Sequence, residues 1–101
     1  MTIETVVLAS QIDLETLVEI IECGGRSITL STTLKSKPDC SHFHVKKSNR
    51  LGTLEITLLA DRLTVEIGFH DNRAGDGWME SDIKELVSEL GNLTRVEDKL
   101  R

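Results

Sequence analysis

Residues 54–69 have the sequence LEITLLADRLTVEIGF, in which two runs alternate between apolar and polar side chains. A period of two with one apolar face is typical of half-buried strands in an antiparallel sheet. Pairing residues whose numbers sum to 123 places Ile56 opposite Ile67, so that the two apolar faces match. The stretch therefore predicts two antiparallel strands joined by a turn at Asp61 and Arg62.

The alternation continues towards the N-terminus. Phe43 and Val45 alternate with polar residues, and pairing to a sum of 99 sets Phe43 opposite Ile56. Residues 2–8 are rich in β-branched side chains and predict a further strand. Residues 28–34 alternate as well, and the members that we expect on the core face are Ile28, Leu30, Thr32 and Leu34.

Two other segments have the periodicity of helices. Residues 10–13 resemble a capped helix start, and the apolar stripe after them ends at Gly24 and Gly25. A second helix is predicted to begin at residues 80–82 and to end at Gly91. Leu93, Val96 and Leu100 after it form either a frayed continuation or a third helical piece. The two stripes consist of Leu14, Leu17, Val18 and Ile21, and of Ile83, Leu86, Val87 and Leu90.

The expected order is therefore β-α-β-β-β-β-α within a single domain, residues 1–101. Because the helices and the sheet each have one apolar face, we expect an α+β two-layer sandwich. Its sheet is mainly antiparallel, with four to five strands, and both helices cover the same face. The alternation leaves open whether the first strand lies in the middle or at the edge of the sheet.

The composition is that of a soluble, acidic globular protein, with a net charge of −5 and 39% hydrophobic residues. The apolar runs are far shorter than the roughly 20 residues of a transmembrane helix, so we expect no membrane contact. No early basic residues mark a signal peptide. We therefore expect a cytoplasmic protein in which Cys23 and Cys40 are reduced.

The charges are unevenly distributed along the chain. Residues 1–25 hold five acids and no bases, whereas residues 26–50 hold six bases against Asp39 alone. A basic patch of this kind attracts an acidic protein or a phosphate group. Nucleic acid is disfavoured, since Glu55 and Glu66 occupy the outward face and no aromatic side chain stands there for base stacking. The candidate partner-binding residues are Lys35, Lys37, His42, His44, Lys46, Lys47 and Arg50.

Cys40, His42 and His44 form the sharpest local pattern. Alternate residues of a strand share a face, so the two histidines can converge on one metal ion, with Cys40 or the cross-strand Glu55 as a further ligand. His70 lies two strands away, roughly 12 Å from His44, and is not expected to join them. The alternative interpretation is a pair of exposed histidines on a polar face.

A second candidate site is the loop that precedes the last helix. It contains Asp71, Arg73 and Asp76, but its spacing does not match a calcium-binding loop. Trp78 follows it and is either an anchor for a partner or a large side chain packed against the sheet.

The sequence contains no nucleophile-elbow motif and no glycine-rich nucleotide fingerprint. We therefore expect a non-catalytic binding module without a cofactor, contacting a protein partner or a second copy of itself. One alternative is a small enzyme that handles a metal or a phosphate through Cys40, His42 and His44. A nucleic-acid-binding domain is the other. The partner, the pathway and the oligomeric state stay open.

Overall fold

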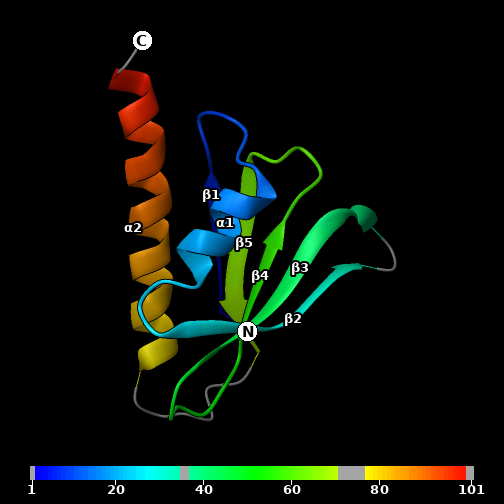
Figure 1. Cartoon of the computed structure of the whole chain (residues 1–101), viewed down its shortest axis with the longest axis vertical. Coiled ribbons are helices and arrows are strands. Elements are labelled where there is room, and N and C mark those ends of the chain that lie inside the picture. Colours follow the sequence, from blue (N-terminus) through cyan, green and yellow to red (C-terminus); the bar gives the residue numbers. More distant parts are fainter. Residues whose placement is uncertain (1, 35–36, 71–76, 100–101) are drawn as a thin grey trace.

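A computed structural model describes residues 2–34, 37–70 and 77–99 (Figure 1). Its elements follow the order β-α-β-β-β-β-α, and its five strands form one antiparallel sheet, which confirms the predicted α+β fold. Within the described residues, no helix is both long and apolar enough to cross a membrane. The elements are β1 (Thr2–Val7), α1 (Leu14–Ile21), β2 (Arg26–Leu34), β3 (Lys37–Lys47), β4 (Leu54–Leu58), β5 (Thr64–Phe69) and α2 (Trp78–Lys99).

The strands lie in the order β1-β5-β4-β3-β2. Both predicted registers are confirmed, because Phe43 lies opposite Ile56 and Ile56 lies opposite Ile67. The position of the first strand, which the sequence left open, is at one edge of the sheet, where β1 pairs with β5. β2 forms the other edge.

Both helices pack on the same face of the sheet, as predicted (Figure 1). The α1 helix starts at its Asp13 cap, whose Oδ1 accepts a hydrogen bond of 2.7 Å from the Thr16 N–H. The apolar stripes of the helices meet the apolar faces of the strands in one core. Its strand residues include Phe43, Val45, Leu54, Ile56, Val65 and Ile67, and its helical residues include Leu17, Ile21, Met79, Ile83, Leu86 and Leu90.

Trp78 is part of this core and begins α2. The residue is 5% exposed, and its indole Nε1 donates a 2.6 Å hydrogen bond to the carbonyl oxygen of Leu51. The indole therefore joins the start of α2 to the segment between β3 and β4. Of the two interpretations of Trp78, the structure favours the packed side chain over an exposed anchor.

The predicted core face of β2 is wrong beyond Ile28. A register shift lies between Ile28 and Leu30, so that Leu30 pairs with His44. This irregularity exchanges the two faces of the strand, and Leu30 is 45% exposed. At the shift, the Thr29 hydroxyl donates a hydrogen bond of 3.3 Å to the His44 carbonyl oxygen.

The second helix does not end at Gly91 but continues to Lys99. Gly91 does not adopt the left-handed conformation that would end a helix. A glycine inside a helix costs only about 1 kcal/mol relative to alanine. Gly91 is therefore compatible with a helix that continues past it.

Candidate functional site

The face of the sheet opposite the helices, which we call the open face, carries the polar members of the alternating strands. Register brings His44 of β3 opposite Glu55 of β4, and His42 opposite Thr57. These residues belong to the inner strands, whose backbones are paired on both sides. The site is therefore built on the most firmly held part of the sheet.

The Nε2 atoms of both histidines point at a single carboxylate oxygen. His42 Nε2 lies 3.4 Å from Glu55 Oε1, and His44 Nε2 lies 3.7 Å from the same atom. The two imidazole rings are 5.1 Å apart at an angle of 76°. All three ligating atoms lie within 4.8 Å of one another. We call His42, His44 and Glu55 the histidine–carboxylate cluster.

A hydrogen bond on its far side orients the ring of His42. Its Nδ1 lies 2.8 Å from the Thr57 hydroxyl oxygen, and Thr57 is 8% exposed. Because Nδ1 is engaged with Thr57, Nε2 is the nitrogen directed towards Glu55. The side chain of His42 is 14% exposed and that of His44 is 37% exposed, so His44 is the more accessible of the two rings.

As expected, His70 is not one of the three converging residues, but it contacts the cluster through Glu55, which the backbone spacing did not predict. His70 Nε2 lies 2.8 Å from Glu55 Oε2, the second oxygen of the same carboxylate. The expected 12 Å was the separation between the backbones of His44 and His70. Glu55 lies on β4, between β3 and β5, and its two carboxylate oxygens contact histidines on both sides. Gly68, which pairs with Glu55, has no side chain to separate Glu55 from His70. The chain's three histidines therefore surround one carboxylate.

Cys40, proposed as a further ligand, is not among the residues that converge. It is buried, with 4% exposure, and the group of possible ligands consists of His42, His44 and Glu55. A second irregularity explains this difference. The β2–β3 register passes from Thr33–Ser41 directly to Leu34–Lys37, so Cys40 lies in a part of β3 that is out of regular pairing.

A small hollow adjoins the cluster. It has a volume of about 100 Å³ and is lined by Ile3, His42, Glu55, Thr57, Glu66 and Gly68. The absence of a side chain at Gly68 helps to explain the space. The hollow accommodates a few water molecules but is much smaller than the roughly 300 Å³ at which ligand pockets begin.

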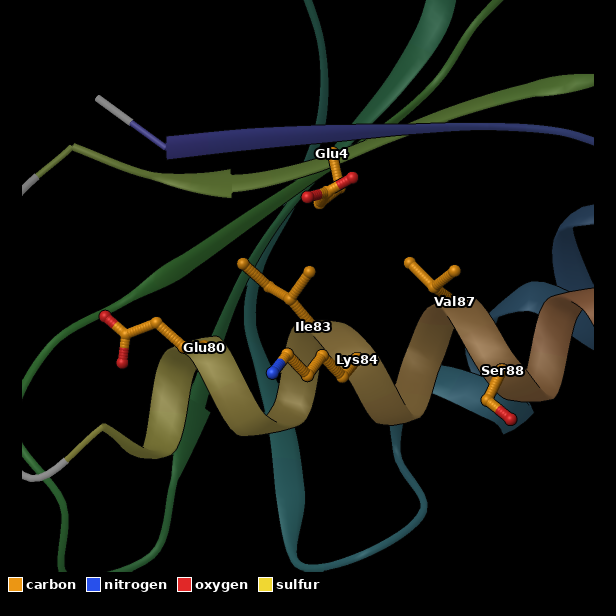
Figure 2. Close-up of a pocket in the computed structure, with 6 residues that line it drawn as sticks. All are labelled: Glu4, Glu80, Ile83, Lys84, Val87 and Ser88. Carbon is orange, nitrogen blue, oxygen red and sulfur yellow. The ribbon is translucent and has the colours of Figure 1, made fainter.

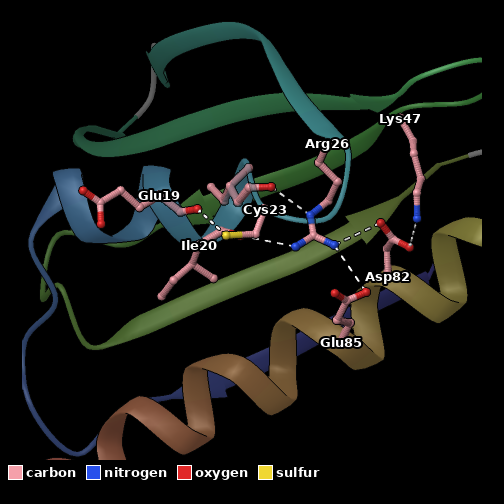
Figure 3. Close-up of polar contacts among 8 residues, drawn as sticks. Glu19, Ile20, Cys23, Arg26, Lys47, Asp82 and Glu85 are labelled. Atoms are coloured by element: carbon pink, nitrogen blue, oxygen red, sulfur yellow. Dashed lines mark hydrogen bonds and ion pairs between the residues drawn. The ribbon is translucent and has the colours of Figure 1, made fainter.

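Two bases of the predicted basic patch, Arg26 and Lys47, pair with one acid of α2 (Figure 3). Arg26 Nη1 lies 3.1 Å from Asp82 Oδ2, and Lys47 Nζ lies 2.9 Å from Asp82 Oδ1. Arg26 is 3% exposed, and its guanidinium also donates to the carbonyl oxygens of Ile20 and Ile21. Lys47 belongs to this network on the helix side of the sheet, and its side chain is 28% exposed. Its assignment to a partner-binding surface stays a prediction.

The other predicted partner-binding residues have different settings. Lys46 is exposed on the open face, and Arg50 is exposed but takes part in an interaction of its own. Lys35 lies outside the described residues, as do Asp71, Arg73 and Asp76 of the loop before α2, and the side chain of Lys37 is not described either. The described cations therefore do not form a continuous patch on the open face.

A larger groove lies on the helix side of the sheet, between β1 and α2 (Figure 2). Its volume is about 430 Å³, and its lining is formed by Glu4, Glu80, Ile83, Lys84, Val87 and Ser88. Ile83 and Val87 point from α2 towards β1, from which Glu4 points back. Sequence reasoning missed this groove, because it depends on which strand lies beside α2.

The Arg26–Asp82 pair was also missed. Its partners are 56 residues apart, and Arg26 was counted from the sequence only among the bases of residues 26–50.

Comparisons with protein-family models, with curated proteins and with solved structures found no match for this chain.

Proposed function

We propose that this chain is a non-catalytic metal-binding module that holds one divalent transition-metal ion, best matched by Zn²⁺, at His42, His44 and Glu55. The single observation that carries the proposal is the convergence of two imidazole Nε2 atoms on one carboxylate oxygen.

The spacing of these atoms supports a metal ion better than direct hydrogen bonding. Zinc bonds to histidine and carboxylate ligands are roughly 2.0–2.2 Å long, so two tetrahedral ligands lie about 3.3–3.6 Å apart. The separations of 3.4 Å and 3.7 Å from Glu55 Oε1 are close to that spacing. A strong charge-assisted N–H···O hydrogen bond would be shorter, at about 2.7–2.9 Å.

The surroundings of the cluster supply the outer contacts that metal ligands normally have. When Nδ1–H of His42 donates to the Thr57 hydroxyl, Nε2 keeps the lone pair that binds a metal. The second oxygen of Glu55 is held by His70 at 2.8 Å. Ligating carboxylates are commonly hydrogen-bonded in this way, which fixes their orientation.

The donor set also indicates which ions fit. Two imidazoles and one carboxylate suit zinc and its first-row neighbours, whereas calcium and magnesium prefer sites built from oxygen alone. Three protein ligands leave a position for water, and the adjoining hollow of about 100 Å³ has room for it. A hollow of that size does not enclose an organic substrate, which favours binding over catalysis.

The free cysteines are consistent with a reducing compartment such as the cytoplasm, which we include in the proposal. They also require a control, since thiolates bind zinc strongly. Cys23 is exposed and its Sγ donates to the Glu19 carbonyl oxygen at 3.2 Å, on α1 and away from the cluster.

Isothermal titration calorimetry on the untagged full chain, stripped with a chelator, tests the proposal. We expect one Zn²⁺ per chain, and we expect His44→Gln and Glu55→Gln each to weaken binding by about 100-fold or more, because loss of an outer contact alone costs about 10–100-fold. The matched control is Cys23→Ser, which should bind zinc like the unmodified chain. Binding that survives both cluster substitutions, or that is lost in Cys23→Ser, would refute the site.

A further inference from the structure

The two edges of the sheet differ in how well they are protected. β2 carries two register shifts, and such irregularities discourage a further strand from pairing at an edge. By contrast, β1 pairs with β5 in unbroken register from Thr2 to Val7. Within the described residues, no strand lies beyond β1. The regular edge is therefore the one that a further strand can join.

The register determines which backbone groups of β1 face outward. The Leu8 N–H donates to the Leu63 carbonyl oxygen at 2.7 Å, so Leu8 and every second residue before it point their backbone groups towards β5. Ile3, Thr5 and Val7 consequently direct their N–H and C=O groups to the free edge. These groups are the ones that an incoming strand must bond.

The same three residues present their side chains on the open face, and two of these side chains are large, apolar and exposed. Ile3 is 49% exposed and Val7 is 72% exposed. They lie symmetrically on either side of Thr5. A strand that is symmetric about its centre in this respect is suited to pairing with a second copy of itself around a two-fold axis.

Only certain registers satisfy the outward groups of both copies. Odd-numbered residues must pair with odd-numbered residues, so the paired numbers must have an even sum. A sum of 8 places Glu4 opposite Glu4 of the other copy, and directly opposed like charges are destabilising. A sum of 12 leaves Ile3 opposite residue 9, beyond the strand. In the register with a sum of 10, Ile3 of each copy lies opposite Val7 of the other. The two Thr5 residues then face each other at the centre, and Glu4 lies opposite Val6.

We infer that β1 is a self-docking edge, through which two copies of this chain pair antiparallel around Thr5 and join their sheets into one. In this arrangement Ile3 and Val7 of the two copies form one apolar cluster on the open face. On the helix side, Val6 of the second copy lies beside Glu4, next to the groove into which Ile83 and Val87 point (Figure 2). This inference is independent of the proposed metal site.

The test exploits the fact that Ile3 of one copy meets Val7 of the other. Ile3→Lys and Val7→Glu are prepared as separate proteins, with circular dichroism to confirm that each folds. Size-exclusion chromatography with light scattering should give a dimer for the unmodified chain. Each variant alone should dimerise at least about tenfold more weakly, because a charge then faces an apolar side chain in both pairs.

Mixing the two variants should restore a dimer with one copy of each. In that pair the introduced lysine faces the introduced glutamate, and the remaining Val7 faces the remaining Ile3. The control is Leu30→Lys, which places the same charge at an exposed apolar position on the opposite edge, and it should dimerise like the unmodified chain.

An unmodified chain that is monomeric at all accessible concentrations overturns the inference, whatever the variants do. A dimer that is weakened by Leu30→Lys but not by Val7→Glu also overturns it, because the contact then uses the other edge. Failure of the mixed variants to associate, when each folds and is monomeric alone, contradicts the register centred on Thr5.

Discussion

Nε2 of His70 lies 2.8 Å from Oε2 of Glu55, on the side of the carboxylate that does not face His42 and His44. Glu55 thus joins a residue just beyond the end of β5 to two residues of β3. One oxygen faces the two histidines that we assign as ligands, and the other is held in place. This division of the carboxylate makes His70 a positioning residue in the proposed site.

From this role we predict that His70→Ala weakens zinc binding less than His44→Gln does. Loss of an outer contact typically costs 10–100-fold in affinity, and the 62% exposure of the His70 side chain places the expected loss near the lower end, at about tenfold. Calorimetry with both variants provides the comparison. Equal or greater loss in His70→Ala would indicate that His70 is itself a ligand.

A second prediction concerns Asp82, which accepts from two cations at once. Asp82→Ala leaves Arg26 buried without its main partner, and breaking a buried pair in this way costs about 3–5 kcal/mol. Glu85 remains 3.6 Å from Arg26, so we expect the free energy of unfolding to fall by about 3 kcal/mol in urea titrations. Glu85→Ala, the matched control at a half-exposed acid, should cost less than about 1 kcal/mol.

A third prediction compares two glycines. Gly52 has a φ of +97°, and a Cβ there would lie 2.9 Å from Met79 Cε, so Gly52→Ala should destabilise the fold by about 1–3 kcal/mol. Gly91 lies within α2, and a Cβ there would meet nothing within 4 Å. Gly91→Ala should therefore stabilise the chain by about 0.5–1 kcal/mol. Thermal unfolding midpoints that move in the same direction for both variants would be inconsistent with these assignments.

A fourth prediction concerns acid. Backbone hydrogen bonds from Leu63, and then from Thr64, lower the pKa of Asp61 below its ordinary value of 3.8. The charged form is thus favoured in the folded chain, so its contribution to stability is present above that ordinary value and is lost as the pH falls through the lowered pKa.

The Asp61→Asn substitution keeps an oxygen acceptor at this position but removes the group that titrates. Urea unfolding should find the unmodified chain more stable than Asp61→Asn at neutral pH, with the difference shrinking below about pH 4. A difference that stays constant down to about pH 2 would show that the carboxylate charge contributes nothing.

The fold was largely predictable from the sequence, because the alternation of apolar and polar residues indicates which side of a strand is buried. It succeeded for β3, β4 and β5, where Phe43, Ile56 and Ile67 align without irregularity. It failed at Leu30, because a bulge inserts one residue and exchanges the faces, and nothing in a run of alternating residues marks where that occurs.

The site was predictable only in part, for a related reason. Strand alternation and register brought His42, His44 and Glu55 together in advance. The contribution of His70 depends on the reach of the Glu55 side chain and on the space above Gly68, which backbone spacings do not contain. The local sequence also gave no sign that Lys47 would bind an acid on α2.

The most direct test of the metal site is to observe the imidazole nitrogens themselves. Long-range ¹H–¹⁵N NMR spectra of the full chain, recorded before and after one equivalent of Zn²⁺, distinguish metal-bound from free ring nitrogens. We predict that Nε2 of His42 and Nε2 of His44 become metal-bound, while Nδ1 of His42 carries the hydrogen that it donates to the Thr57 hydroxyl. Unchanged nitrogens in His42 and His44, or a shift confined to the exposed ring of His70, would contradict the proposed site.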